Sequence, residues 1–251
     1  MILYQEMPPW PALAPYLACL WTCHVTALDG GLTHRVLPDN CIDILWQDSD
    51  PHGGVAGMMS RAIEVPFARP VRTLAVRFKP GAAAWFFDLP LHELRDLHPS
   101  LGELWGSTLA GQFADALWSK ELSDDAALDV LQRLLLQRLQ ASRLRPGLVE
   151  HAVAAIEASN GSLRIESLAD TLGVSRQHLS SQFRARVGLS AKLFARICRF
   201  QHASAHLRTV DAGRFDMAAL AMELGYYDQP HMIHEFRALS GSTPQSFAVK
   251  T

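Results

Sequence analysis

Apolar and polar residues alternate with the period of a β-strand through the first eighty residues of the chain. Residues 71–81 show this best, because Leu74, Val76 and Phe78 fall on one face of an extended segment. Strands are predicted over residues 17–28, 34–47 and 71–81, with a loop over 48–54. The second of these is interrupted by the turn-like Pro38-Asp39-Asn40. Short strands at this spacing predict a small sandwich or barrel.

After Gly81 the apolar positions change to a helical period. In residues 124–140 four leucines recur at i, i+3, i+7 and i+11: Leu128, Leu131, Leu135 and Leu139. Two aspartates at the start of this segment suit the N-terminus of a helix. The stripe predicts either a helix packed on the chain's own core or a seam between two copies, so a homodimer through 124–140 stays open.

Residues 150–251 form a run of helical patterns that contains an internal repeat. The motif Leu-Ala-x-x-Leu-Gly at 168–173 recurs at 220–225, and after one inserted residue the match continues to Phe194 and Phe247. Ten residues are identical in about 27 aligned positions, which unrelated helices do not reach.

Each copy of the repeat has the plan of a helix-turn-helix unit. A short amphipathic helix ends at a glycine, which adopts positive φ at little cost. Ser175 in the first copy and Asp228 in the second then provide a cap for the next helix. Apolar residues four positions apart pin that helix to the first one: Leu179 and Phe183, then Met232 and Phe236.

The second helix of each copy also carries a polar face, and such a face can reach base edges in the major groove of B-DNA. In the first copy this face consists of Arg176, Gln177, Ser180, Ser181 and Arg184. In the second copy it consists of Gln229, His231, His234 and Arg237. Residues 192–207 predict one unbroken helix between the copies, which would hold the two faces about 34 Å apart, one turn of DNA.

The net charge of −2 hides a difference between the two halves of the chain. Residues 1–144 hold 11 Lys/Arg and 16 Asp/Glu, giving −5, whereas residues 145–251 hold 12 and 9, giving +3. An acidic first half, called the front half below, and a mildly basic second half predict two domains, 1–144 and 145–251, with different partners.

Four cysteines are present: Cys19, Cys23, Cys41 and Cys198. Cys19 and Cys23 have CxxxC spacing, but a closed zinc site needs four ligands, usually from two close pairs. Because no second close pair is present, we expect reduced structural thiols and not a zinc site. We also see neither a secretory signal nor an apolar stretch long enough to span a bilayer. A cytoplasmic protein without a cofactor, a metal or a membrane partner is therefore the expectation.

The closing stretch GYYDQPHMIHEFRALSGSTPQSF, residues 225–247, resembles the signature of the AraC/XylS family of bacterial transcription regulators. The similarity includes the glycine-aromatic start, the Asp cap, the Phe-Arg pair, the Thr-Pro pair and the final Phe247. The resemblance covers about 100 residues. It implies a bundle of seven helices with two helix-turn-helix units that read successive major grooves of double-stranded DNA, with RNA polymerase as a protein partner.

Carried over position by position, the resemblance assigns base contacts to Gln177, Ser180 and Ser181, and in the second unit to Gln229, Pro230, His231 and His234. Arg184 and Arg237 resemble phosphate contacts, which position a protein without specifying sequence. Three departures stand out. Ala191 replaces a frequent proline, Pro230 removes a backbone donor from the first turn of its helix, and histidines stand where an arginine is common. The histidines predict weaker specificity or pH-dependent binding.

The front of the chain resembles the strand-rich sensor or dimerisation domains of the same family, many of which hold a small molecule in a cupin-like barrel. Trp21, His24 and Trp46 are the candidate effector-binding residues, because each combines a ring with a polar group. The alternative is that all three are ordinary core or surface residues.

The sequence thus predicts a two-domain α+β protein: a barrel or sandwich followed by helices, then an all-α domain of about seven helices. Its predicted function is sequence-specific transcription regulation, controlled by a small molecule or by dimerisation, and not catalysis. One alternative is a DNA-tethered enzyme that depends on a metal or a cysteine. We find no nucleophile elbow, phosphate-binding glycine loop or paired carboxylates to support it. Another is an architectural DNA binder, against which the acidic front argues.

Overall fold

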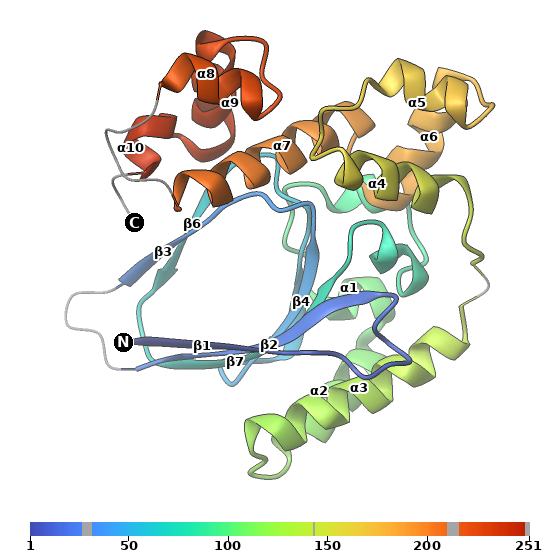
Figure 1. Cartoon of the computed structure of the whole chain (residues 1–251). Coiled ribbons are helices and arrows are strands. Elements are labelled where there is room, and N and C mark those ends of the chain that lie inside the picture. The colour runs from blue at the N-terminus through green and yellow to red at the C-terminus, as the bar shows by residue number, and fades with distance from the viewer. Residues whose placement is uncertain (27–31, 143, 210–215, 249–251) are drawn as a thin grey trace.

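A computed structural model describes residues 1–26, 32–142, 144–209 and 216–248 of the 251-residue chain. Its first half is strand-rich and its second half is helical, as the sequence predicts (Figure 1). None of the helices in the described ranges has the length and hydropathy needed to cross a bilayer.

The described strands of the front form two antiparallel sheets. They are β1 (Ile2–Met7), β2 (Leu17–Val25), β3 (Leu32–Val36), β4 (Ile42–Gln47), β5 (Asp50–Ala56), β6 (Ile63–Phe67) and β7 (Val71–Phe78). The larger sheet has the order β1-β2-β7-β4-β5, and the smaller one pairs β3 with β6. Figure 1 shows the β3–β6 ribbon standing across from the larger sheet. The strand predicted over 17–28 is β2, and residues 27 and 28 lie outside the described part.

Both faces of β7 are buried. The predicted apolar face of Leu74, Val76 and Phe78 is fully buried in the main core. On the opposite face, Ala75 belongs to a second apolar cluster, on which Phe67 of the smaller sheet packs. Side chains of successive β7 residues therefore point alternately into two packed layers, and not alternately into the core and into solvent.

The interruption predicted at 38–40 lies between two strands, β3 and β4, which belong to different sheets. The prediction of a loop after them is wrong. The predicted loop over 48–54 contains most of β5, where Gly54 pairs with Leu45 of β4. Gly53 adopts a φ of +80°, and a Cβ there would lie 2.8 Å from the Trp46 ring. The glycine at 53, which suggests a loop in the sequence, thus allows β5 to pass close to the Trp46 ring.

Helices and 3₁₀ turns follow the sheets and cover the main core. They are the 3₁₀ turns η1 (Ala82–Trp85) and η2 (Leu91–Leu94), then α1 (Leu101–Trp105), α2 (Ser107–Trp118) and α3 (Asp124–Gln140). Ser123 caps α3 by accepting the backbone N–H of Ala126 at 3.3 Å. Leu128, Leu131 and Leu135 of α3 are at most 2% exposed inside the chain's own core. The leucine stripe is therefore core and not a free dimer seam, which corrects the basis for a homodimer through 124–140.

Seven helices are described in the second half, as predicted. They are α4 (Leu148–Ala158), α5 (Ile165–Thr171), α6 (Arg176–Val187), α7 (Ala191–Leu207), α8 (Met217–Glu223), α9 (Gln229–Ser240) and α10 (Pro244–Ala248). The main core runs on from the sheet into this bundle without a break, because Phe113 and Phe183 belong to one cluster. The two halves are therefore packed on each other.

Candidate nucleic-acid interface

The first helix-turn-helix unit consists of α5 and α6. Gly173 adopts a φ of +66° in the turn, and the Ser175 hydroxyl accepts the backbone N–H of His178 at 3.1 Å. Leu179 and Phe183 are buried, at most 1% exposed. The glycine, the cap and the two anchors are all where the sequence predicts them.

The second unit consists of α8 and α9 and repeats this plan. Gly225 adopts a φ of +80°, and Asp228 accepts the backbone N–H of His231 at 2.7 Å. Met232 and Phe236 are fully buried. Pro230 lies in the first turn of α9, where a helix makes no use of a backbone N–H.

The helix α7 joins the two units, which lie at its two ends (Figure 1). Phe194 of α7 meets Phe183 edge-on at a centroid distance of 5.4 Å, and Phe200 meets Phe236 in the same way at 4.9 Å. One straight helix thus packs against both second helices. It sets their separation through rigid aromatic contacts rather than through a flexible linker.

The predicted reading residues of α6 lie together on an exposed face. They line a hollow of about 580 Å³, whose walls are Arg176, Gln177, Ser180, Ser181, Arg184 and His92. The first five come from one side of α6, whereas His92 comes from η2 in the front half. Sequence reasoning missed His92, because no local signal connects it with a helix that begins 84 positions further on.

The predicted reading residues of α9 divide into two groups. Pro230, His234 and Arg237 are exposed, and Gln229 is half-buried. His231 instead faces its own unit: its Nδ1 accepts the backbone N–H of Tyr227 at 3.2 Å, and its Nε2 lies 3.5 Å from Glu235 Oε1. The structure therefore leaves His234 and Arg237 facing outward and involves His231 in internal contacts.

Glu235 is a buried carboxylate that sequence reasoning missed. Its side chain is 5% exposed, and Oε1 accepts from Arg196 Nε at 2.7 Å. Arg199, one turn further along α7, lies 3.9 Å from the other carboxylate oxygen. The i, i+4 spacing of His231 and Glu235 is visible in the sequence, but the contact with α7 depends on tertiary packing.

The three candidate effector residues do not come together. Trp46 is fully buried and stacks on Phe113 of α2 at 5.6 Å. The Nε2 of His24 lies 2.7 Å from Asp124 of α3. Trp21 is separate from both, since its indole N–H donates to Asp43 at 3.2 Å.

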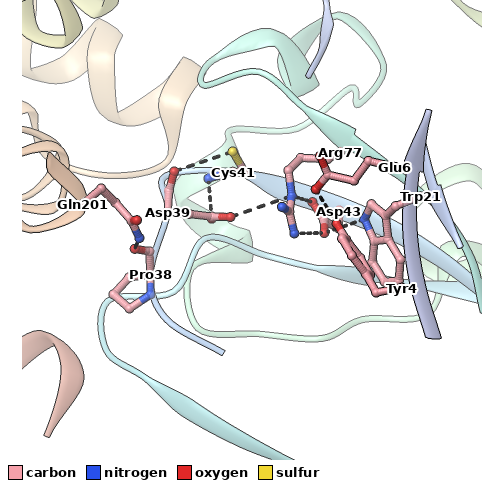
Figure 2. A network of polar contacts seen from close by, with 9 residues as sticks. All are labelled: Tyr4, Glu6, Trp21, Pro38, Asp39, Cys41, Asp43, Arg77 and Gln201. Carbon is pink, nitrogen blue, oxygen red and sulfur yellow. Dashed lines mark hydrogen bonds and ion pairs between the residues drawn. The ribbon is translucent and has the colours of Figure 1, made fainter. Parts of the chain in front are cut away.

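Trp21 belongs to a polar network inside the front half (Figure 2). Arg77 makes two hydrogen bonds to Asp43, at 3.0 and 2.9 Å, and lies 3.7 Å from Asp39. Burial acts to lower the pKa of Arg77, but the hydrogen bonds and charge of Asp43 outweigh it and raise that pKa. The Arg77 guanidinium is therefore charged at neutral pH, whereas burial raises the pKa of the Asp43 carboxyl and the hydrogen bonds from Arg77 oppose that rise.

The same network reaches the helical half through residues 38–40. Gln201 of α7 donates to the backbone carbonyl of Pro38 (Figure 2). Asn40 is 4% exposed and donates from Nδ2 to the carbonyl of Phe194 at 3.1 Å. The residue between them is Asp39, which faces Arg77. One short segment thus contacts both the ion pair of the front half and the helix that joins the two units.

The four cysteines are free thiols, as expected. Burial is the main cause that raises the pKa of Cys19 to about 11, and burial also raises the pKa of Cys41. Such thiols hold little thiolate at neutral pH. Within the described ranges, no group of three or more His, Cys, Asp or Glu side chains is arranged to hold a metal ion.

Comparison with known families finds one match in each half of the chain. Residues 168–249 match the family described as a helix-turn-helix domain, and residues 5–100 match a domain of unknown function (DUF6597). No curated protein matches the chain.

Three solved structures illustrate what the chain is similar to. The C-terminal domain of AraT, a response regulator from Geobacillus stearothermophilus, is 26% identical over 44% of this chain and 89% of its own, with a TM-score of 0.39. ToxT from Vibrio cholerae is 10% identical over 98% of both chains, with a TM-score of 0.47. ToxT bound to an unsaturated fatty acid is 10% identical over 99% of this chain and 94% of its own, with a TM-score of 0.40. Because all three TM-scores are low, the functional conclusion depends on the domain match and on the two units.

Proposed function

We propose that this protein is a transcription regulator with an AraC-type helix-turn-helix domain, and that it inserts α6 and α9 into successive major grooves of double-stranded DNA. The observation that carries the proposal is the packing of two capped helices on one helix, α7. A regulator of this kind works where its DNA is, so we expect it in the cytoplasm. Contact with RNA polymerase remains a prediction.

In the first unit, the side chains of Gln177, Ser180 and Ser181 are proposed to reach base edges. They are exposed and short, and amide and hydroxyl groups read donors and acceptors in the major groove. Arg184 and Arg176 border them on the same face and are proposed to contact phosphates.

In the second unit, Pro230 and His234 are proposed to face the bases, with Gln229 beside them and Arg237 on a phosphate. His231 is assigned a different role. Its ring is held by Tyr227 and lies near Glu235, so we propose that it orients α9 rather than reading DNA.

Selection of bound duplexes from a random DNA pool tests the proposal. We expect two information-rich blocks about one helical turn apart. On the best duplex, Gln177→Ala should relax specificity at one block by about 1–3 kcal/mol. Arg184→Ala should weaken binding to all sequences and reduce the salt slope by about 1. Gln182→Ala is a matched control, because Gln182 is exposed on α6 but does not line the hollow.

Binding without a selected motif would contradict the proposed reading of two grooves. Affinity would then depend on salt alone, and the domain would be a non-specific anchor. About one tightly held metal ion per purified chain would favour the alternative of a DNA-tethered enzyme.

We further propose that the front half controls DNA binding through residues 38–40. This segment contacts both the Arg77–Asp43 pair and α7, so a change at the pair would reach the helix that spaces the two units. Arg77→Met should alter DNA affinity or specificity without touching DNA. Unchanged binding by a folded Arg77→Met chain would contradict this route. A small-molecule effector remains the expected cause of such a change.

A further inference from the structure

The front half contributes one side chain to the exposed reading face of α6. His92 lines the same hollow as Arg176, Gln177, Ser180, Ser181 and Arg184. All six residues are exposed, so the hollow is open to solvent. It combines two guanidinium groups, an imidazole, an amide and two hydroxyls, and among the described residues no carboxylate lines it.

The charges of this hollow are not balanced by the chain itself. Among the described residues, neither Arg176 nor Arg184 forms an ion pair with a carboxylate. Arginine and histidine side chains that converge without a carboxylate favour an external anion, and phosphate is the anion that a DNA-reading helix meets.

The position of His92 is fixed by its neighbours. Leu91 and Leu94 on either side are at most 2% exposed, so η2 is anchored in the core. The backbone of η2 also lies close to the end of α6, because a Cβ on Gly188 would be 2.9 Å from the Leu91 carbonyl oxygen. His92 is therefore presented beside α6 by a rigid element rather than by a loose loop.

We propose that His92 contacts a backbone phosphate next to the groove that α6 enters, so that the front half is part of the DNA-binding surface. The inference rests on the proposed function. The contact positions the duplex without reading its sequence. An element that instead blocked α6 would be expected to place carboxylates against Arg176 and Arg184, and the residue found there is a histidine.

The test uses the full chain and the duplex that the selection yields. His92→Ala should weaken binding by about tenfold or more at every sequence, since one hydrogen bond to a charged group is lost. His92→Arg should restore affinity and steepen the salt slope by about 0.9, the value for one neutralised phosphate. His98→Ala is the matched control, because His98 is also exposed near η2 but does not line the hollow.

Phosphate ethylation interference gives an independent readout. One interfering phosphate beside the first block should vanish in His92→Ala and return in His92→Arg. Wild-type affinity in His92→Ala would overturn the inference, and tighter binding would overturn it in favour of a blocking role for η2. In both cases the wild-type chain still binds its duplex. A wild-type chain that binds no duplex would overturn the proposed function as well.

Discussion

The guanidinium of Arg196 on α7 donates from Nε to Oε1 of Glu235 on α9 over 2.7 Å, and the Glu235 side chain is 5% exposed. A carboxylate so far from water is stable only while its partner is present. The same oxygen lies 3.5 Å from His231 Nε2. The orientation of α9 on α7 therefore depends on a buried charge.

Glu235→Gln should lower the free energy of unfolding by about 2 kcal/mol. Removing one partner of a fully buried pair costs about 3–5 kcal/mol. The effect should be smaller here because Arg196 is 30% exposed. Urea denaturation measures the change, with the exposed Glu223→Gln as the control. Equal stability of the two variants would mean that the pair contributes nothing.

The Asp124 carboxylate joins α3 to the large sheet, and its contribution should depend on pH. It accepts from Arg72 at 2.7 and 3.0 Å and pairs with His24. Burial acts to raise the pKa of Asp124, but the hydrogen bonds from His24 and Arg72 outweigh it and hold the pKa below its ordinary value. A carboxyl with a lowered pKa stabilises the fold above the unfolded pKa, near 4, and loses that effect as pH falls through the folded pKa.

Asp124→Asn should therefore cost about 2 kcal/mol at pH 7, the scale of hydrogen bonds to a charged group. The difference from wild type should persist at pH 5 and shrink at pH 3. Urea titrations at the three pH values measure it. The neighbouring Asp125→Asn, exposed in the same turn, should show little difference at any of them. A constant difference down to pH 3 would contradict the ionic origin.

Local signals explain why the DNA-binding half could be predicted. The cap Ser175, the turn glycine Gly173 and the anchor Phe183 lie within eleven residues, and their spacing is set by helix geometry alone. The repeat adds a second, independent copy of the same signals. Prediction from residues is reliable where the interacting groups are close in the sequence.

The effector candidates show where such reasoning stops. Alternation in β4 places Trp46 on the same face as Ile44, so its burial was visible in the sequence, but its polar nitrogen suggested a ligand instead. The His24–Asp124 pair joins residues 100 positions apart, and only the crossing of α3 over the sheet brings them together. His92 reaches α6 in the same non-local way.

The two histidines of α9 should give opposite results. His231→Ala removes the acceptor for the Tyr227 N–H and should lower the free energy of unfolding by about 1 kcal/mol. His234→Ala should leave stability unchanged, because the side chain is exposed, and should weaken binding to the selected duplex. Denaturation and duplex titration of both variants separate the two roles. If a His231→Ala chain were as stable as wild type but lost base discrimination, His231 would be a DNA-reading residue and not a residue that orients α9.

Two glycines on either side of α6 provide a test of the packing between the halves. Gly173 adopts a φ of +66°, and among the described residues no neighbouring atom comes within 4 Å of the place that a Cβ would take. Gly173→Ala should therefore cost only the backbone strain of about 1–2 kcal/mol. Gly188 adopts a φ of +91°, and a Cβ there would overlap Met58 Cε and lie 2.9 Å from the Leu91 carbonyl oxygen. Gly188→Ala thus carries the same strain and a collision with the front half.

We expect Gly188→Ala to be the more destabilising substitution by at least about 1 kcal/mol, as overpacking usually is. Adding Met58→Ala should recover only part of the difference, because the Leu91 carbonyl belongs to the backbone and cannot turn away. Thermal and urea unfolding of the two single variants and the double variant measure these differences in the free energy of unfolding. Equal costs at Gly173 and Gly188 would mean that η2 does not rest on α6 in solution, and His92 would then lose its fixed place beside the reading face.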